Sequence, residues 1–389
     1  MRIQIDGTNT VNKGAELMLY AVLQEIERKY PAAEVVINSM RMSRSYIQTS
    51  LNCSVRPLLK IIIPALWRVR LPQILRLLSL PYSFFTNRYA LKGIDVVLDA
   101  GGFQFGDQWK ITDDVVKQWE NYYRKLKNYG TKIVLLPQAF GPFETENGKR
   151  IALVVSKYAD IIMAREQISY NHLIKAGVDE DKVKIFPDFT ALVEGKMPKQ
   201  CEYLKEYICI IPNRQMIHKG IITQEEYIFL LSKIIDTVKS QGKDIFLLNH
   251  EGKGDSLLCQ IINERFNNKI VVVNNLNALE VKGVISQSYL VISSRFHGVA
   301  SALNSGVPCL ATSWSHKYAE LFKDYNQNDC VLDLNNIDES ISKIETFLSK
   351  KIHKEISDSL KVAKKSIIDK NKEMWQKVWK KNEINCNCF

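Results

Sequence analysis

The sequence lacks acidic residues over one long stretch, because no Asp or Glu occurs between Glu34 and Asp95. It also lacks an unbroken run of the roughly 20 apolar residues that a membrane-spanning helix needs. The first residues, MRIQID, lead directly into a strand pattern and show none of the features of a signal peptide. We therefore expect a cytoplasmic protein of the ordinary globular class.

The eight cysteines lack the spacing of a metal site or of a disulfide framework. Six are scattered singly along the chain, and Cys386 and Cys388 form a Cys-x-Cys close to its end. We interpret that pair as part of a terminal tail rather than as a metal site. The sequence therefore predicts no bound metal.

The net charge of +11 is unevenly placed, because the stretch without acids is rich in cations. These cations are Arg41, Arg44, Arg56, Lys60, Arg68, Arg70, Arg76, Arg88 and Lys92. Apolar and aromatic residues lie between them, a mixture typical of a lipid headgroup interface. The insertion 41–92 therefore predicts peripheral contact with the inner face of the cell membrane through Arg68, Arg70 and Arg76. A pair of core helices with solvated arginines explains the pattern equally well, whereas nucleic acid binding lacks any supporting motif.

Short apolar strands alternate with amphipathic helices over the rest of the chain, which is typical of a parallel sheet covered on both faces. Two such series occur, and the polar stretch 194–205 separates them. We expect an N-terminal domain at 1–195, a C-terminal domain at 205–350, and a terminal helix and tail at 351–389. The predicted fold is α/β, with two Rossmann-like doubly wound domains facing a cleft.

The stretch from 290 to 317, LVISSRFHGVASALNSGVPCLATSWSHK, predicts an anion site. Its apolar start indicates a buried strand, and residues 299–304 indicate a helix of small side chains. Arg295 and His297, flanked by Ser294 and Gly298, lie where that strand ends and the helix begins. Ligands bind at the carboxyl ends of parallel strands, where a helix N-terminus also offers free N–H groups. The alternative is structural: an arginine paired with a core carboxylate and a histidine held in the interior.

Further polar residues follow other strands of the second series. Asn213 and Arg214 come after its first strand, His250 comes after the next, and Lys317 lies beyond the strand at 308–312. Two arginines at one sheet edge can bind a phosphate and a carboxylate together, each charge-assisted contact contributing about 1.5–3 kcal/mol. His250 and His316 are candidates of lower rank for substrate binding, because a surface position or a secondary position behind the site explains each of them as well.

Loops of small and polar residues also follow the strands of the first series. The loop at 7–14 matches neither the G-x-G-x-x-G nor the Walker pattern, although it carries many hydrogen-bonding groups. The paired glycines at 101–102 permit close approach of the backbone to a ligand, and they equally suit a tight turn. The candidate contacts in these loops are Asn9, Asn12, Gly14, Glu16, Gly101, Gly102, Gln138, Gly141, Arg165 and Asp188.

The order of these motifs resembles the polysaccharide pyruvyl transferase family over roughly residues 5 to 320. The matching motifs are Gly14-x-Glu16, Gly101-Gly102, Pro137-Gln138-x-x-Gly141-Pro142, Arg165-Glu166, Pro187-Asp188, Ser294-Arg295-Phe296-His297, Gly306-Val307-Pro308 and Lys317. The Arg-x-His block with the Gly-Val-Pro and Lys that follow it is the most specific part. One residue departs from the pattern, because Ala15 stands where family members usually carry the Asp of a Gly-Asp-Glu.

The resemblance implies a fold similar to GT-B glycosyltransferases and transfer of a pyruvyl group from phosphoenolpyruvate to two hydroxyls of a sugar. It implies a phosphoenolpyruvate site in the C-terminal domain, a glycan or lipid-linked glycan acceptor on the N-terminal domain, and no cofactor. His297 would transfer a proton, as acid or as base, while Arg295 and Arg214 would hold the two anionic groups. The alternatives are a GT-B glycosyltransferase that uses a nucleotide sugar, and a catalytically silent relative that binds membranes or glycans.

Overall fold

The computed structural model describes residues 1–38, 91–312 and 317–380 of the chain. Several predicted features lie outside these residues: nearly all of the insertion 41–92 with Arg68, Arg70 and Arg76, and also His316, Cys386 and Cys388. The chain divides into two compact units. The first unit comprises Met1–Asn9 and Val22–Ile185, and the second comprises Thr10–Ala21 and Phe186–Phe389.

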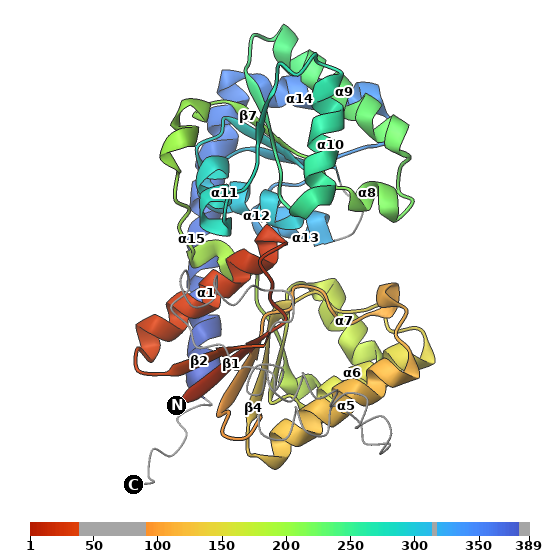
Figure 1. Cartoon of the computed structure of the whole chain (residues 1–389), viewed down its shortest axis with the longest axis vertical. Helices are drawn as coiled ribbons and strands as arrows, with labels where there is room; N and C mark the ends of the chain where they lie inside the picture. The colour runs from red at the N-terminus through yellow and green to blue at the C-terminus, as the bar shows by residue number, and fades with distance from the viewer. Residues whose placement is uncertain (39–90, 313–316, 381–389) are drawn as a thin grey trace, which may run out of the picture. The chain divides into compact units, whose positions relative to one another are not determined.

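The first unit is built on a parallel sheet of six strands in the order β2-β1-β3-β4-β5-β6. The strands are β1 (Arg2–Asp6), β2 (Glu34–Ile37), β3 (Val96–Asp99), β4 (Lys132–Gln138), β5 (Ile161–Ala164) and β6 (Val183–Ile185). The helices are α5 (Asp113–Asn128), α6 (Glu146–Tyr158), α7 (Gln167–Lys175) and the later part of α1 (Lys13–Lys29), whose residues up to Ala21 belong to the second unit. Every residue of β3 and β5 is buried, as expected when helices cover both faces of a sheet. Figure 1 shows α5 and α6 side by side against this sheet.

The second unit contains another parallel sheet of six strands, in the order β12-β11-β10-β7-β8-β9. The strands are β7 (Ile208–Ile211), β8 (Ile245–Leu248), β9 (Val271–Val273), β10 (Leu290–Ser293), β11 (Cys309–Thr312) and β12 (Val331–Leu332). The helices are α8 (Gln215–His218), α9 (Gln224–Ser240), α10 (Gly252–Glu264), α11 (Ala278–Ser286), α12 (Phe296–Ser305), α13 (Lys317–Asp324), α14 (Ile337–Leu348) and α15 (Lys350–Lys380). The central strands β7 and β10 lie side by side, so their carboxyl ends meet at one edge.

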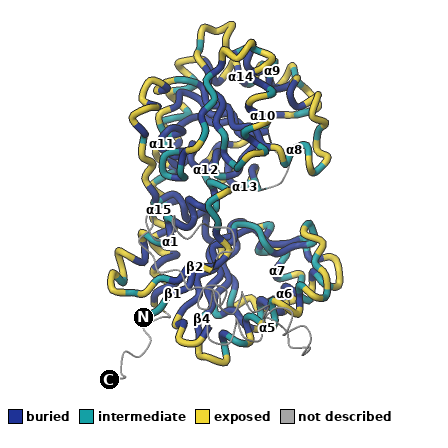
Figure 2. Tube along the Cα trace, viewed as in Figure 1, coloured by how far each residue is buried: buried dark blue, intermediate teal, exposed yellow. Residues whose placement is uncertain are grey.

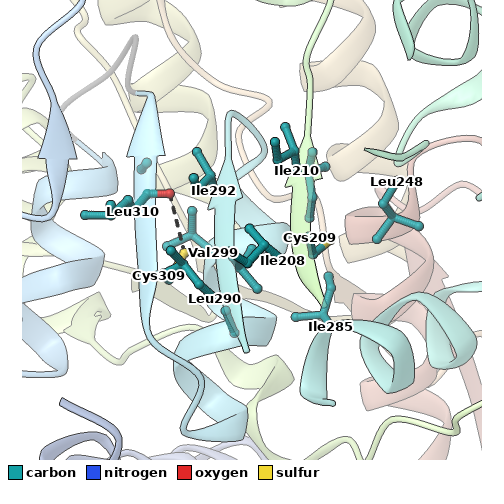
Figure 3. Close-up of a cluster of buried hydrophobic side chains, with 14 of the residues drawn as sticks. Ile208, Cys209, Ile210, Leu248, Ile285, Leu290, Ile292, Val299, Cys309 and Leu310 are labelled. Carbon is teal, nitrogen blue, oxygen red and sulfur yellow. Dashed lines mark hydrogen bonds between the residues drawn. The ribbon is translucent and has the colours of Figure 1, made fainter. Parts of the chain in front are cut away.

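The core of the second unit forms where α12 packs against β7 and β10. Figure 3 shows Ile208 and Ile210 of β7 beside Leu290 and Ile292 of β10, with Val299 of α12 among them. Each of these side chains is at most 1% exposed. Full burial of one such side chain stabilises a fold by about 1.5–3 kcal/mol. Figure 2 shows that in each unit the strands are buried and the outer turns of the helices are exposed.

The predicted terminal helix is confirmed by α15, whose tryptophans pack inward. Trp375 and Trp379 are 2% and 4% exposed, and their rings stack at 5.9 Å. Phe189 meets Trp375 edge-on with ring centroids 6.1 Å apart. Leu360, Ala363 and Ile367 of the same helix belong to the core of the second unit. None of the helices within the described residues is long and apolar enough to cross a membrane.

Candidate functional site

The junction between β10 and α12 carries the predicted Arg-x-His block. Strand β10 ends at Ser293, Arg295 is the N-cap residue of α12, and His297 lies in the first helical turn. A Cβ on Gly298 would lie 2.5 Å from Ser293 Oγ and 2.9 Å from Ile211 Cδ1. Only glycine therefore lets α12 approach the sheet this closely. The predicted position of the block, at a strand end and a helix start, is confirmed.

The His297 imidazole is held on two sides within the second unit. Its Nε2 lies 3.3 Å from Asp188 Oδ2, and the side chain is 12% exposed. A Cβ on Gly14 would lie 2.2 Å from His297 Nδ1, so the ring rests on the first turn of α1. Asn12 caps this turn by accepting a hydrogen bond from Gly14 N at 2.9 Å. The ring is therefore fixed between a carboxylate and a helix backbone.

Asp188 is itself positioned by several hydrogen bonds. Its Oδ1 accepts from Thr190 N at 3.0 Å and from Thr190 Oγ1 at 2.5 Å. Its backbone oxygen accepts from Asn371 Nδ2 of α15 at 3.0 Å. The carboxylate is 4% exposed, and its second oxygen faces His297. A histidine oriented by a buried carboxylate is the arrangement that general acid–base catalysis uses.

Arg295 is paired with two carboxylates. It donates from Nε to Asp255 Oδ2 at 2.9 Å and from Nη2 to Asp255 Oδ1 at 2.7 Å. Its Nη1 also donates to Glu251. Burial opposes the charge of Arg295, but the Asp255 and Glu251 carboxylates raise its pKa overall. The Arg295 guanidinium is thus charged and paired with carboxylates. This pairing is the structural alternative that the sequence analysis names for an arginine at this position. Its role in holding an anion stays a prediction, and that role requires Glu251, which is 29% exposed, to give up its contact.

Arg214 provides a cation without such compensation. It follows β7, is exposed, and pairs with no carboxylate among the residues that the structure describes. Its backbone N–H donates to Asp255 Oδ1 at 3.0 Å. A Cβ on Gly254 would lie 3.0 Å from Arg214 Cδ, so the arginine side chain runs along the first turn of α10. Arg214 and Arg295 therefore share Asp255 as a common partner.

His250 joins the segment after β8 to the start of α1. Its backbone oxygen accepts from Lys13 N at 3.2 Å, and the neighbouring Glu251 forms a β-bridge with Asn12. The His250 side chain is 2% exposed. Burial and the nearby charges of Arg295, His297 and Lys13 place its pKa well below the usual range. We therefore expect a neutral imidazole, in keeping with a secondary role.

Other predicted contacts are engaged inside the protein. Asn213 donates from Nδ2 to Ser294 O at 2.8 Å and accepts from Gln215 N at 2.9 Å. The Ser294 hydroxyl contacts the hydroxyls of Tyr227 and Thr312. These bonds tie the ends of β7, β10 and β11 together, so direct substrate contact by Asn213 and Ser294 stays a prediction.

Two lysines at helix starts complete this set of polar groups. Lys317 at the start of α13 lies over the Phe296 ring, with Nζ 5.6 Å from the centroid. That contact places its charge beside the first residue of α12. Lys13 Nζ donates to Glu16 Oε2 at 2.7 Å, and Glu16 is fully buried. Glu16 therefore carries a partner within α1, and its contact with a substrate stays a prediction.

The predicted loop residues of the first unit meet at the carboxyl ends of β3, β4 and β5. Ala139 N donates to Gly102 O, and Arg165 N donates to Gln138 O, each at 3.0 Å. Gly141 N donates to Phe105 O at 3.0 Å. The structure therefore brings Gly101, Gly102, Gln138, Gly141 and Arg165 to one edge of this sheet. Asn9 belongs to the same unit and lies within the loop that follows β1.

Sequence reasoning missed two buried carboxyls at this edge, Asp6 and Asp99, which end β1 and β3. Asp6 accepts from Tyr122 OH at 2.5 Å, and Asp99 accepts from Gly101 N at 2.9 Å. Burial, with the charge of Asp6 second, raises the pKa of Asp99 to about 7. For Asp99 a signal was available, because it is the single acid that closes the otherwise apolar strand β3.

Asp99→Asn is expected to stabilise the chain at high pH. The pKa of Asp99 is about 7 in the fold, against an ordinary 3.8, so native stability falls as pH rises between these values. The variant should match the native chain near pH 4 and exceed it at pH 8 by up to about 4 kcal/mol. Urea unfolding at both pH values measures the difference.

Asp113→Asn serves as the control for this prediction. Asp113 is exposed, and hydrogen bonds from Lys117 and Arg150 lower its pKa, so its replacement brings no gain at high pH. A stability difference for Asp99→Asn that does not change with pH would contradict the prediction.

Each unit is a parallel sheet with polar candidate site residues at the carboxyl ends of its strands. The chain thus has a two-unit α/β fold of the GT-B type. Solved structures with this fold include Anabaena Alr3699/HepE in complex with UDP and glucose, with a TM-score of 0.61 and 12% identity over 98% of this chain and 99% of that one. The S. aureus MnaA-UDP co-structure has a TM-score of 0.58 and 14% identity over 98% and 97% of the two chains. At these identities the likeness shows the fold alone.

The family is shown by a closer comparison. The polysaccharide pyruvyl transferase family model matches residues 12–316, so the chain belongs to that family. The amylovoran biosynthesis protein AmsJ of Erwinia amylovora is 22% identical over 274 residues, which are 65% of this chain and 64% of that protein. The chain thus aligns with just under two thirds of that relative's length.

Proposed function

We propose that the protein transfers a pyruvyl group from phosphoenolpyruvate to two hydroxyls of a sugar in a polysaccharide or lipid-linked oligosaccharide precursor. The product is a pyruvate ketal, and phosphate is released. The observation that carries this proposal is His297 in the first turn of α12 beside the buried Asp188, in a chain of the polysaccharide pyruvyl transferase family.

The proposed reaction needs one proton delivered to carbon and two additions to C2 of phosphoenolpyruvate. Protonation of the methylene carbon makes C2 electrophilic, and the first sugar hydroxyl adds there. The C2–O bond to phosphate then breaks, and the second hydroxyl adds to C2. The two hydroxyls lose two protons, of which one balances the carbon protonation and the other leaves with phosphate. This sequence needs no metal and no cofactor.

His297 is the group that we assign to proton transfer. Asp188 Oδ2 lies 3.3 Å from Nε2 of the ring, and a positioned imidazole contributes about 10²–10⁴-fold to rate in acid–base steps. The arrangement suits either direction of transfer, to the methylene carbon or from a hydroxyl.

The anionic donor substrate is assigned to the cations near α12. Phosphoenolpyruvate carries a carboxylate and a phosphate, and Arg214, Lys317 and the α12 N-terminus supply complementary charge in the second unit. Arg295 would contribute once an anion replaced Glu251 at its Nη1. Acceptor binding by the loops of the first unit and membrane contact by Arg68, Arg70 and Arg76 stay part of the proposal.

The test is phosphate release from phosphoenolpyruvate in the presence of a candidate glycan, with mass spectrometry of the glycan for the added pyruvate ketal. Calorimetry with phosphoenolpyruvate and with UDP follows on the same protein. Phosphate release coupled to the ketal product supports the proposal. Binding of UDP without binding of phosphoenolpyruvate would overturn it in favour of a glycosyltransferase, and binding of neither would favour a silent relative.

A further inference from the structure

A lysine of the second unit is buried in a place that the proposed reaction does not explain. Lys282 of α11 is 3% exposed, although the residues around it on the helix are apolar. The helix packs by its backbone, because a Cβ on Gly283 would lie 2.2 Å from the carbonyl carbon of Lys196. A Cβ on Gly195 would likewise lie 2.5 Å from Gly283 N. Such close packing fixes the backbone of α11 at Lys282, and therefore the point from which its side chain extends.

The Lys282 ammonium connects to the His297–Asp188 pair through one residue. Its Nζ donates to the backbone oxygen of Thr190 at 2.9 Å. Thr190 in turn donates its N–H and its hydroxyl to Asp188 Oδ1. Asp188 then faces His297 with its other oxygen at 3.3 Å. The Lys282 ammonium of α11 thus reaches His297 of α12 through the backbone and hydroxyl of Thr190 and the carboxylate of Asp188.

Charges on every side of Lys282 bear on its protonation. Burial is the main influence and lowers the pKa of Lys282 to about 7. Asp188 and Glu194 oppose this effect by attraction, whereas Lys364 of α15 adds to it by repulsion. An ammonium in this position therefore costs stability, which an apolar side chain of the same length would not.

We propose that Lys282 is a positioning residue for proton transfer at His297: its ammonium holds the Thr190 carbonyl and balances the Asp188 carboxylate, so that Asp188 stays ionised and aimed at the imidazole. This proposal rests on the proposed role of His297. It explains why a costly cation lies in the interior, one residue away from the pair.

The experiment compares Lys282→Met with Lys282→Arg and with Lys361→Met, a change at a lysine that is 67% exposed. We expect Lys282→Met to lower kcat by about tenfold, which is part of the 10²–10⁴-fold contribution of an acid–base step, while KM for phosphoenolpyruvate is unchanged. Lys282→Arg should recover most of the rate. We expect the native pH–rate profile to show an inflection near pH 7 and the Lys282→Arg profile to lack it. Lys361→Met should behave as native.

Two further measurements do not depend on turnover. Since the pKa of Lys282 lies below its ordinary 10.5, native stability should rise between about pH 7 and pH 10.5. Lys282→Met should therefore unfold at a higher temperature than the native chain at pH 6, with the gap closing towards pH 10. The NMR titration of the Lys282 side chain should move to lower pH in Asp188→Asn, because Asp188 attracts the ammonium.

The outcomes separate the two proposals. Native kcat and a native pH profile in Lys282→Met, or an unchanged Lys282 titration in Asp188→Asn, would overturn the positioning role. Full activity in His297→Gln would instead overturn the role of His297, while the titration would still report the link between Asp188 and Lys282. If Lys282→Met failed to fold, Lys282→Arg and the titration would still decide the question.

Discussion

His297→Gln is expected to lower kcat/KM for phosphoenolpyruvate by about 10²–10⁴-fold, the largest loss of activity that we expect from any single change. Glutamine keeps a polar group of similar reach beside Asp188 but cannot transfer a proton as an imidazole does. Because the ring is 12% exposed and packs on Gly14, the fold should tolerate this change better than removal of the side chain. Phosphate release at several pH values measures the loss.

Asp188→Asn and the double variant show whether the two residues act together. If Asp188 works only through His297, the double variant should be no slower than His297→Gln alone. His218→Gln changes an exposed histidine of α8 and should leave the rate as in the native chain. Losses that simply multiply in the double variant would contradict the idea that Asp188 works only through His297.

Asp255→Ala is expected to destabilise the chain by about 3–5 kcal/mol, because it leaves the buried Arg295 without its main partner. The same change removes the acceptor for Arg214 N. Urea unfolding measures the loss, and adding Arg295→Met should restore part of it, since the uncompensated charge is then gone. Asp358→Ala, at an exposed helix pair, should change nothing measurable. A native unfolding curve for Asp255→Ala would show that Asp255 does not compensate Arg295.

The sequence located the Arg-x-His block correctly because local signals mark that position. The apolar strand ends and the helix of small residues begins within a few positions of this block. In the structure, β10 ends and α12 begins there. The partner of Arg295 was not visible in the same way. Asp255 lies 40 positions earlier, at a helix start, where an acid is common for purely local reasons. Long-range pairing of this kind depends on which strands are neighbours, and single-sequence patterns do not show that.

Gly14 and Lys282 illustrate two kinds of structural information: a long-range contact that the sequence does not show, and a local pattern that it does show. Gly14 was predicted as a ligand contact, but the reason for glycine at this position is the His297 ring, which lies far away in the sequence. Lys282 did carry a local signal. It follows Ala278 by four residues and precedes Ile285 by three, so helical spacing places it on an apolar face. A charge on such a face indicates an internal partner.

The assignment of residues 10–21 to the second unit affects how the halves of this protein can be recombined. An exchange between two relatives at a single point near residue 186 would combine His297 of one parent with Gly14 and Asn12 of the other. If the parent of the N-terminal segment carried a larger residue at position 14, that side chain would clash with the His297 imidazole. Functional chimeras therefore need two crossovers, so that the short N-terminal segment is inherited together with the C-terminal half.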